Sequence, residues 1–218
     1  GIASAENDMV TIPIGIGETT LQPIAFTLHS GEHALIAGRV RSGKSSMLQA
    51  IARLVSASGL AVIGLAPPHS PLHGERSCAA VVQTPAELVT HLERCEQAVV
   101  LVDDATSFTD LDGALQTILS QPPCVVTMIV AGRTDRLGKA FGHWTQTIRE
   151  SRVGVLLNPD ILDGDLLGCQ LPSRLGATGV GRGWIVNGTE AQRCQAATVQ
   201  GTTPTDIGDY RSRLTKSA

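Results

Sequence analysis

Short apolar segments alternate with amphipathic ones along most of the chain. Apolar runs typical of buried strands occupy residues 24–28, 33–38, 60–66, 78–83, 98–102, 124–131 and 153–157, after a first short strand in "VTIPIGIGE". Helices are expected between them at 44–58, 85–97 and 110–121, the second opening with a capping box of Thr84 and Glu87. Repeated strand–helix–strand units predict an α/β fold with a mostly parallel sheet and helices on both faces.

The pattern changes in the last third of the chain. There, "GRGWIVNG" and "AQRCQAATVQ" predict two antiparallel strands joined by a turn at Asn187–Gly188. No internal repeat or low-complexity linker divides the sequence, so we expect a single domain over residues 1–200 and a polar, flexible tail over 201–218. The abrupt start without Met suggests one module of a longer chain.

Composition narrows the classes of function. The net charge of −3 is close to neutral, which argues against a whole domain built to grip nucleic acid or a membrane surface. No apolar run approaches the roughly 18 residues that span a bilayer. The 5 cysteines are scattered without a C-x-x-C pair, which is typical of reduced thiols in a cytosolic protein.

A phosphate-binding loop follows the strand at 33–38. Residues 38–45 read "GRVRSGKS", which matches G-x-x-x-x-G-K-[ST] in full between an expected strand and an expected helix. The two glycines permit close approach of backbone N–H groups to phosphate, Lys44 neutralises phosphate oxygens, and Ser45 offers a hydroxyl to Mg²⁺. The sequence therefore predicts that ATP and Mg²⁺ bind here, at Gly38, Arg41, Ser42, Gly43, Lys44, Ser45 and Ser46.

Two adjacent carboxylates end the strand at 98–102, in "AVVLVDDATSF". Asp103 lies where P-loop ATPases place the acid that holds Mg²⁺. Asp104 occupies the position of a general base, which is usually the longer Glu. Its carboxylate is retracted by about 1.5 Å, which matters for a proton transfer that needs atoms about 2.6 to 3.2 Å apart. The alternative for Asp104 is an N-cap of the next helix.

Several segments together resemble the FtsK/SpoIIIE group of translocase ATPases, and within it the C-terminal ATPase modules of EccC, the motor of type VII secretion. The resemblance runs over roughly residues 10–199 and is carried by the P-loop and by "VTIPIGIGETTLQPIAFTL", "LVDDATSF", "TIRESRVGVLLNPDILDGDLLG", "GVGRGWIVN" and "QRCQAATV". The P-loop is specific by itself, whereas the other segments gain weight from their order and spacing.

This resemblance implies a RecA-like core that binds ATP and Mg²⁺ at a subunit interface, in a hexameric ring or between neighbouring modules of one chain. It implies a polymer substrate: a secreted protein for EccC, or duplex DNA for the DNA-pumping members. It also implies a cytoplasmic module that meets the membrane only through other parts of the full-length protein. Arg152 matches the family's arginine finger, with Arg149 as the alternative; from the sequence, a surface arginine at a helix end is an equal reading.

Two departures from the family pattern bear on hydrolysis. The DNA-pumping members carry Asp-Glu where this chain has Asp103–Asp104, and a polar Thr-Gln pair where it has Ala131-Gly132-Arg133. Arg133 could sense the γ-phosphate, pair with Asp135, or point to solvent. These departures predict weak or conditional hydrolysis. The alternatives are a docking module that binds nucleotide without hydrolysing it, and a DNA translocase, which the lack of clustered basic residues disfavours.

Two further pairs of residues, two histidines and two aromatic residues, each allow two interpretations. His69 and His73 have the spacing of metal ligands, but the surrounding "APPHSPLHGERS" is more typical of a surface loop. Phe141 and Trp144 in "GKAFGHW" are expected to pack on the sheet, with an exposed hydrophobic anchor as the alternative.

Overall fold

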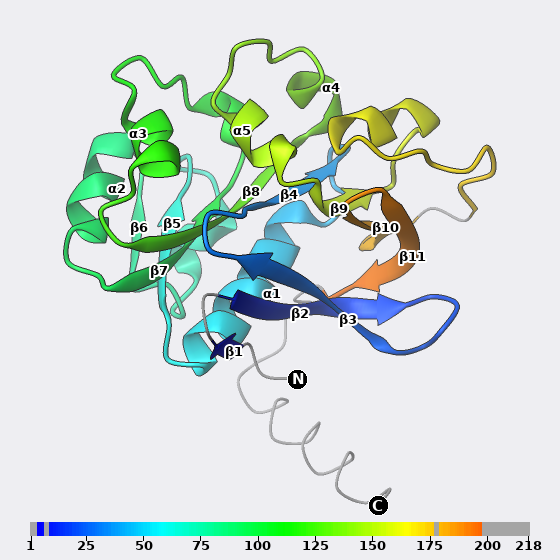
Figure 1. Cartoon of the computed structure of the whole chain (residues 1–218), viewed down its shortest axis with the longest axis horizontal. Coiled ribbons are helices and arrows are strands. Elements are labelled where there is room, and N and C mark those ends of the chain that lie inside the picture. The colour runs from blue at the N-terminus through cyan, green and yellow to red at the C-terminus, as the bar shows by residue number, and fades with distance from the viewer. Residues whose placement is uncertain (1–3, 7–8, 177–178, 198–218) are drawn as a thin grey trace, which may run out of the picture.

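The computed structural model describes residues 4–6, 9–176 and 179–197, so the predicted tail over 201–218 lies outside the described residues. The centre of the protein is an 11-stranded mixed sheet (Figure 1). Its strand order is β1-β2-β11-β10-β9-β4-β8-β7-β5-β6, with β3 paired to β2. One half of the sheet is parallel and the other antiparallel. The predicted α/β class is therefore confirmed.

The parallel half consists of six of the seven short apolar runs, and the run at 24–28 belongs to the antiparallel half. Its strands are β4 (Ala34–Gly38), β5 (Ala61–Leu65), β6 (Ala80–Val82), β7 (Gln97–Val102), β8 (Val125–Arg133) and β9 (Val153–Leu157). Most of their side chains are buried on both faces, as expected for strands covered by helices on either side. Because these strands are parallel, their carboxyl ends meet at one edge of the sheet, which is where ligands bind in open α/β folds.

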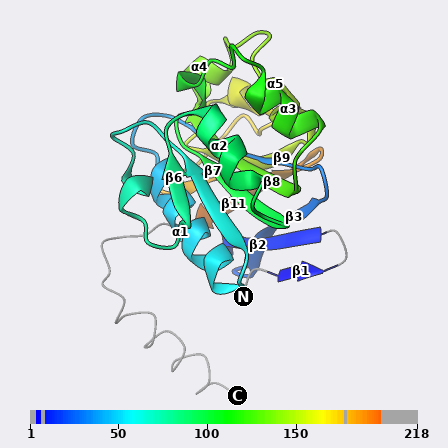
Figure 2. The same cartoon turned by 90° about the vertical axis from the view of Figure 1, so that its left-hand side faces the viewer.

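Helices cover both faces of the parallel half. Figure 2 shows α1 (Lys44–Ala57) on one side and α2 (Pro85–Leu92), α3 (Ala114–Ser120) and α5 (Thr145–Glu150) on the other. The first side buries Met47, Leu48, Ile51 and Val55, and the second buries Leu88, Leu92, Leu115, Ile118 and Ile148. Short helical segments complete this half: α4 (Thr134–Leu137), η1 (Pro71–Gly74), η2 (Ala105–Ser107) and η3 (Ile161–Leu166).

Two helix boundaries differ from the sequence-based expectation. The capping box at Thr84 and Glu87 is present, but α2 ends at Leu92 instead of 97. Helix α3 begins at Ala114 instead of 110, because Gly113 adopts a φ of 67° and the Asp110 carboxylate accepts the N–H groups of Leu115 and Gln116, both at 2.8 Å. Asp110 thus caps the helix from outside it.

The antiparallel half draws strands from both ends of the chain. The hairpin of β10 (Arg182–Asn187) and β11 (Glu190–Ala196) forms as predicted, with Gly188 at a φ of 65° in its turn. Strand β2 (Met9–Gly17) pairs with β11, and β2 also carries β1 (Ser4–Glu6) and β3 (Pro23–His29). The antiparallel addition predicted from the C-terminal sequence therefore includes the N-terminal strands as well.

The two aromatic residues of "GKAFGHW" have opposite environments. Trp144 is buried, and its indole Nε1 donates to the carbonyl of Phe108 at 3.0 Å. Phe141 is 92% exposed in the loop between α4 and α5. The packed interpretation is right for Trp144 and wrong for Phe141, since the loop lifts its ring off the sheet.

No helix in the described part of the chain is long and apolar enough to cross a membrane.

Candidate nucleotide site

The backbone of the phosphate loop requires its two glycines. A Cβ at Gly38 would lie 2.5 Å from Ser42 Oγ and 2.7 Å from the carbonyl oxygen of Leu157, so only glycine fits at the end of β4. Gly43 has a φ of 103° just before α1, a conformation that disfavours other residues. Arg41 also has a positive φ, of 60°, and so holds a strained turn without being glycine.

The loop encloses a hollow of about 220 Å³. It is lined by Arg41, Ser42, Gly43, Lys44, Ser45, Ser46 and Val180. The hollow lies at the N-terminus of α1, where unpaired N–H groups and the helix dipole favour an anion. Among the described residues, Ser42 Oγ is a buried atom without a hydrogen-bond partner. These features fit a phosphate group.

Lys44 is half-buried and lies within reach of the negative charges of Asp103 and Asp104. Its Nζ donates to the carbonyls of Gly38 at 3.1 Å and Arg39 at 2.7 Å. Burial lowers the pKa of Lys44, while the negative charges of Asp103 and Asp104 act in the opposite direction. The ammonium therefore lies inside the curve of the loop, where it can compensate phosphate charge.

Asp103 is held by hydrogen bonds to both of its carboxylate oxygens. Oδ1 accepts from Ser45 Oγ and from the N–H of Asp104, both at 3.1 Å, and Oδ2 accepts from Ser70 Oγ at 2.7 Å. The pairing of Ser45 with Asp103 fits a Mg²⁺ site, because a hydroxyl and a carboxylate are oxygen ligands of the kind that Mg²⁺ takes. We call Lys44, Ser45, Ser70 and Asp103 the floor of the site.

Sequence reasoning missed Ser70. It belongs to the loop between β5 and β6, which the proline and histidine content marked as a surface loop, and nothing in the residues around it signals contact with a strand end more than thirty positions away. A serine directly before Pro71 does match a helix N-cap, and Ser70 caps η1 by accepting the N–H of Leu72 at 3.2 Å.

Asp104 is turned toward a different partner from Asp103. Its backbone is left-handed, with φ 48° and ψ 53°, and its Oδ2 lies 3.9 Å from Nη1 of Arg136 on α4. It is the residue before η2, but its side chain makes no capping hydrogen bond. The interpretation of Asp104 as an N-cap is therefore wrong, because the carboxylate accepts no hydrogen bond from the backbone of η2.

Exposed ion pairs surround the entrance to the phosphate loop. Arg133 donates to Asp135 through Nε at 3.0 Å and through Nη2 at 2.7 Å. Of the three interpretations of Arg133, the structure therefore has the salt bridge to Asp135. Arg39 of the loop pairs with Asp160, the residue before η3. These two pairs line a hollow of about 410 Å³. The rim of the site, as used below, consists of Arg39, Asp104, Arg133, Asp135, Arg136 and Asp160.

The structure does not bring the two candidate arginine fingers to this chain's own phosphate loop. Arg149 donates through Nε to the carbonyl of Leu166 at 3.0 Å, and Arg152 is exposed with a φ of 51°. Both line a separate hollow of about 330 Å³ that also includes Phe141. The arginine-finger role of Arg152 therefore stays a prediction.

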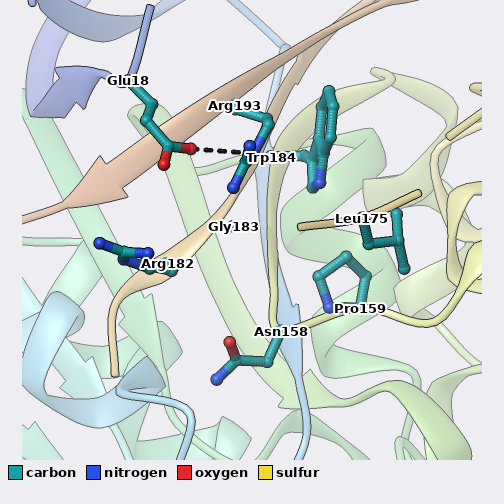
Figure 3. A pocket seen from close by; sticks show the side chains of 8 residues that line it. All are labelled: Glu18, Asn158, Pro159, Leu175, Arg182, Gly183, Trp184 and Arg193. Carbon is teal, nitrogen blue, oxygen red and sulfur yellow. Dashed lines mark ion pairs between the residues drawn. The ribbon is translucent and has the colours of Figure 1, made fainter. Parts of the chain in front are cut away.

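Main-chain hydrogen bonds connect the phosphate loop to the antiparallel half of the sheet. Gly181 donates its N–H to the carbonyl of Ser42 at 3.0 Å and accepts from the N–H of Ala196 at 2.7 Å. Beside this link, Figure 3 shows the guanidinium of Arg193 between Glu18, paired at 2.8 Å, and the ring of Trp184, 6.0 Å from its centre. The pocket there holds about 20 Å³, room for a single water. The contacts of Arg193 therefore join Glu18, next to β2, to Trp184 of β10.

No protein-family model matches the chain, and no curated protein matches it by sequence. Solved structures do match. The cytoplasmic domain of the type VII secretion ATPase EccC of Thermomonospora curvata superposes with a TM-score of 0.66 at 21% identity, covering 88% of this chain and 26% of that one. EccC ATPases 2 and 3 of the same organism, in complex with a signal sequence peptide, give a TM-score of 0.63 at 18% identity, covering 88% of this chain and 41% of that one.

A third match is the pCW3 conjugation coupling protein TcpA, in its monomer form with ATPγS. Its TM-score is 0.65 at 15% identity, and the match covers 96% of this chain and 72% of TcpA. This chain thus spans 26% to 41% of the length of the two EccC structures. Together the matches show that the chain has the RecA-like fold of secretion and conjugation ATPases, as its sequence predicted.

Proposed function

We propose that this chain is an ATP- and Mg²⁺-binding module of an FtsK/SpoIIIE-type translocase, of the kind found in the EccC motor of type VII secretion, with weak or conditional hydrolysis. One observation carries the proposal. Ser45 and Asp103 are hydrogen-bonded at 3.1 Å beside a half-buried Lys44, at the carboxyl edge of a sheet shared with EccC. A hydroxyl, a carboxylate and an ammonium grouped in this way support a Mg–nucleotide site.

The residues around the phosphate loop have roles that follow from their places. The α1 N-terminus and Lys44 would bind phosphate oxygens, and Ser42 Oγ offers a buried hydroxyl without a partner among the described residues. Ser45 and Asp103 would hold Mg²⁺, which when bound contributes positive charge to the phosphate oxygens. Val180, 60% exposed beside the loop, gives an apolar surface to whatever follows the phosphates.

Weak hydrolysis is supported by the position of Asp104. Its carboxylate is one methylene shorter than the usual Glu, and it lies 3.9 Å from the guanidinium of Arg136. A general base must reach the water whose proton it takes, so a carboxylate paired with a cation on α4 is poorly placed for that task. Turnover would then depend on a movement of α4, for example on assembly with a neighbouring module in a ring.

The second candidate is a docking module that binds nucleotide without hydrolysing it and receives a secreted protein. The EccC structure with a signal sequence peptide supports this alternative by fold alone. A DNA translocase is disfavoured by the scattered basic residues of the chain. In either of the first two cases the module would be the cytoplasmic part of a larger, membrane-tethered protein.

The test is calorimetric binding of Mg·ATP together with turnover, for the native chain and for Asp104→Ala, with and without neighbouring modules. We expect micromolar or tighter binding of ATP by both proteins, and turnover of the native chain that rises on assembly and is lost in Asp104→Ala. Equal, negligible turnover of both in the assembled complex, with ATP still bound, would leave only the docking module. An absence of ATP binding by the native chain would overturn the proposed function.

A further inference from the structure

The loop between β5 and β6 is fastened to the phosphate-loop helix at several points. Gln49 of α1 donates through Nε2 to the carbonyl of Pro71 at 3.3 Å, and Arg53 of α1 donates to Glu75 at 3.0 Å. Leu72, between these contacts, is completely buried. The loop is therefore packed against α1, although its composition marks it as a surface loop.

Within this loop, the direction of the Ser70 hydroxyl is fixed by its two partners. Ser70 is 5% exposed, and its Oγ accepts the N–H of Leu72 at 3.2 Å. A backbone N–H can only donate, so the Ser70 hydrogen is free to point at its other partner, Oδ2 of Asp103, at 2.7 Å. Ser70 is thus a donor to the carboxylate and cannot be replaced in this role by a residue that only accepts.

The contact with Ser70 decides which way the Asp103 carboxylate faces. With Oδ2 held by Ser70, Oδ1 is the oxygen that meets Ser45 Oγ at 3.1 Å. Asp103 is 6% exposed, so a loss of Ser70 Oγ would leave Oδ2 buried without this donor, which costs free energy. A rotation of the carboxylate that gives Oδ2 another partner would then be favourable. Partners of this kind orient the residues that bind metals and contribute strongly to metal affinity.

We infer that Ser70 is a positioning residue of the Mg²⁺ site: it holds Asp103 so that the carboxylate and the Ser45 hydroxyl face the ion together. The inference rests on the proposed function, because Mg²⁺ enters with the nucleotide. It also assigns the β5–β6 loop to the metal side of the site, coupled to α1 through Gln49 and Arg53.

The experiment measures the dissociation constant of ATP by calorimetry, once with Mg²⁺ and once with EDTA, and takes the ratio of the two. In Ser70→Ala we expect the gain in affinity from Mg²⁺ to fall about 10-fold, while affinity in EDTA stays within about twofold of native. Ser70→Thr keeps the hydroxyl and should restore the ratio. Gln49→Ala loosens the same loop without touching Asp103 and should leave the ratio at its native value.

The outcomes separate this inference from the proposed function. A native ratio in Ser70→Ala would overturn the inference alone, and so would an equal loss of affinity with and without Mg²⁺, which is what a merely structural role predicts. If the native chain bound no ATP under either condition, the proposed function would fall and the inference with it. Should Ser70→Ala fail to fold, Ser70→Cys replaces the hydroxyl by a weaker donor of similar size, and the same ratio should fall between the alanine and native values.

Discussion

On the floor of the phosphate site, Asp103 is buried and its two oxygens accept hydrogen bonds from two hydroxyls and one backbone N–H. On the rim, the carboxylates of Asp104, Asp135 and Asp160 are paired with arginines at the surface. Hydrogen bonds in a buried setting fix geometry, whereas exposed ion pairs contribute about 0–1 kcal/mol and exchange partners easily. The binding side of the site is thus preorganised and the hydrolytic side is adjustable.

The largest expected effect comes from removing the floor's cation. Lys44→Ala should weaken ATP binding by about 100-fold or more, because charge-assisted hydrogen bonds to phosphate are among the strongest in proteins. Calorimetry with Mg·ATP measures this. Lys139→Ala, which removes an exposed lysine just beyond α4, is the matched control and should bind as the native chain does. An unchanged affinity of Lys44→Ala would contradict the assignment of the loop.

A smaller effect, on turnover, is expected from lengthening Asp104 of the rim. Asp104→Glu should raise the turnover of the assembled protein about 10-fold, since the added methylene recovers the reach of a general base while ATP affinity stays near native. A steady-state phosphate-release assay measures it. Asp112→Glu adds a methylene at an exposed position of the loop before α3 and should change nothing. If Asp104→Glu is as slow as native, the length of this side chain does not limit the reaction.

The smallest effect concerns the ion pair between Arg39 and Asp160. Both side chains are more than half exposed, so the pair should contribute little to stability and be screened by salt. Arg39→Ala should shift the unfolding midpoint by no more than about 1 °C and ATP affinity by about twofold, less at 0.5 M salt than at low salt. A large, salt-independent loss in calorimetry would mean that Arg39 belongs to the floor and not to the rim.

The sequence predicted the fold well where local pattern and burial agree. All seven apolar runs listed from the sequence became strands, and the glycines of the phosphate loop are both required by its backbone. The approach of Ser70 to Asp103 could not be predicted, because it arises from the packing of the β5–β6 loop on α1, and no periodicity marks that contact. The opposite fates of Phe141 and Trp144 likewise depend on a loop conformation that composition does not specify.

The ion pairs of the rim were only partly accessible to sequence reasoning. The pairing of Arg133 with Asp135 was one of three alternatives. It could be considered because the two residues are only two positions apart in the sequence. Arg136 was not connected with Asp104, nor Arg39 with Asp160, because each pair joins segments separated by 32 or more positions. Long-range pairs at a surface leave little trace in a single sequence.

The connection through Gly181 has a consequence for how freely this protein can change its sequence. Both of its hydrogen bonds, to Ser42 and from Ala196, are made by main-chain atoms. Substitutions at positions 42 and 196 can alter side chains without removing the groups that form the link. Gly181 itself has a φ of 75°, which other residues adopt only with strain. The link itself therefore makes no demand on the side chains at its two ends, which are constrained by burial and by the phosphate loop, and it resists change at the single glycine between them.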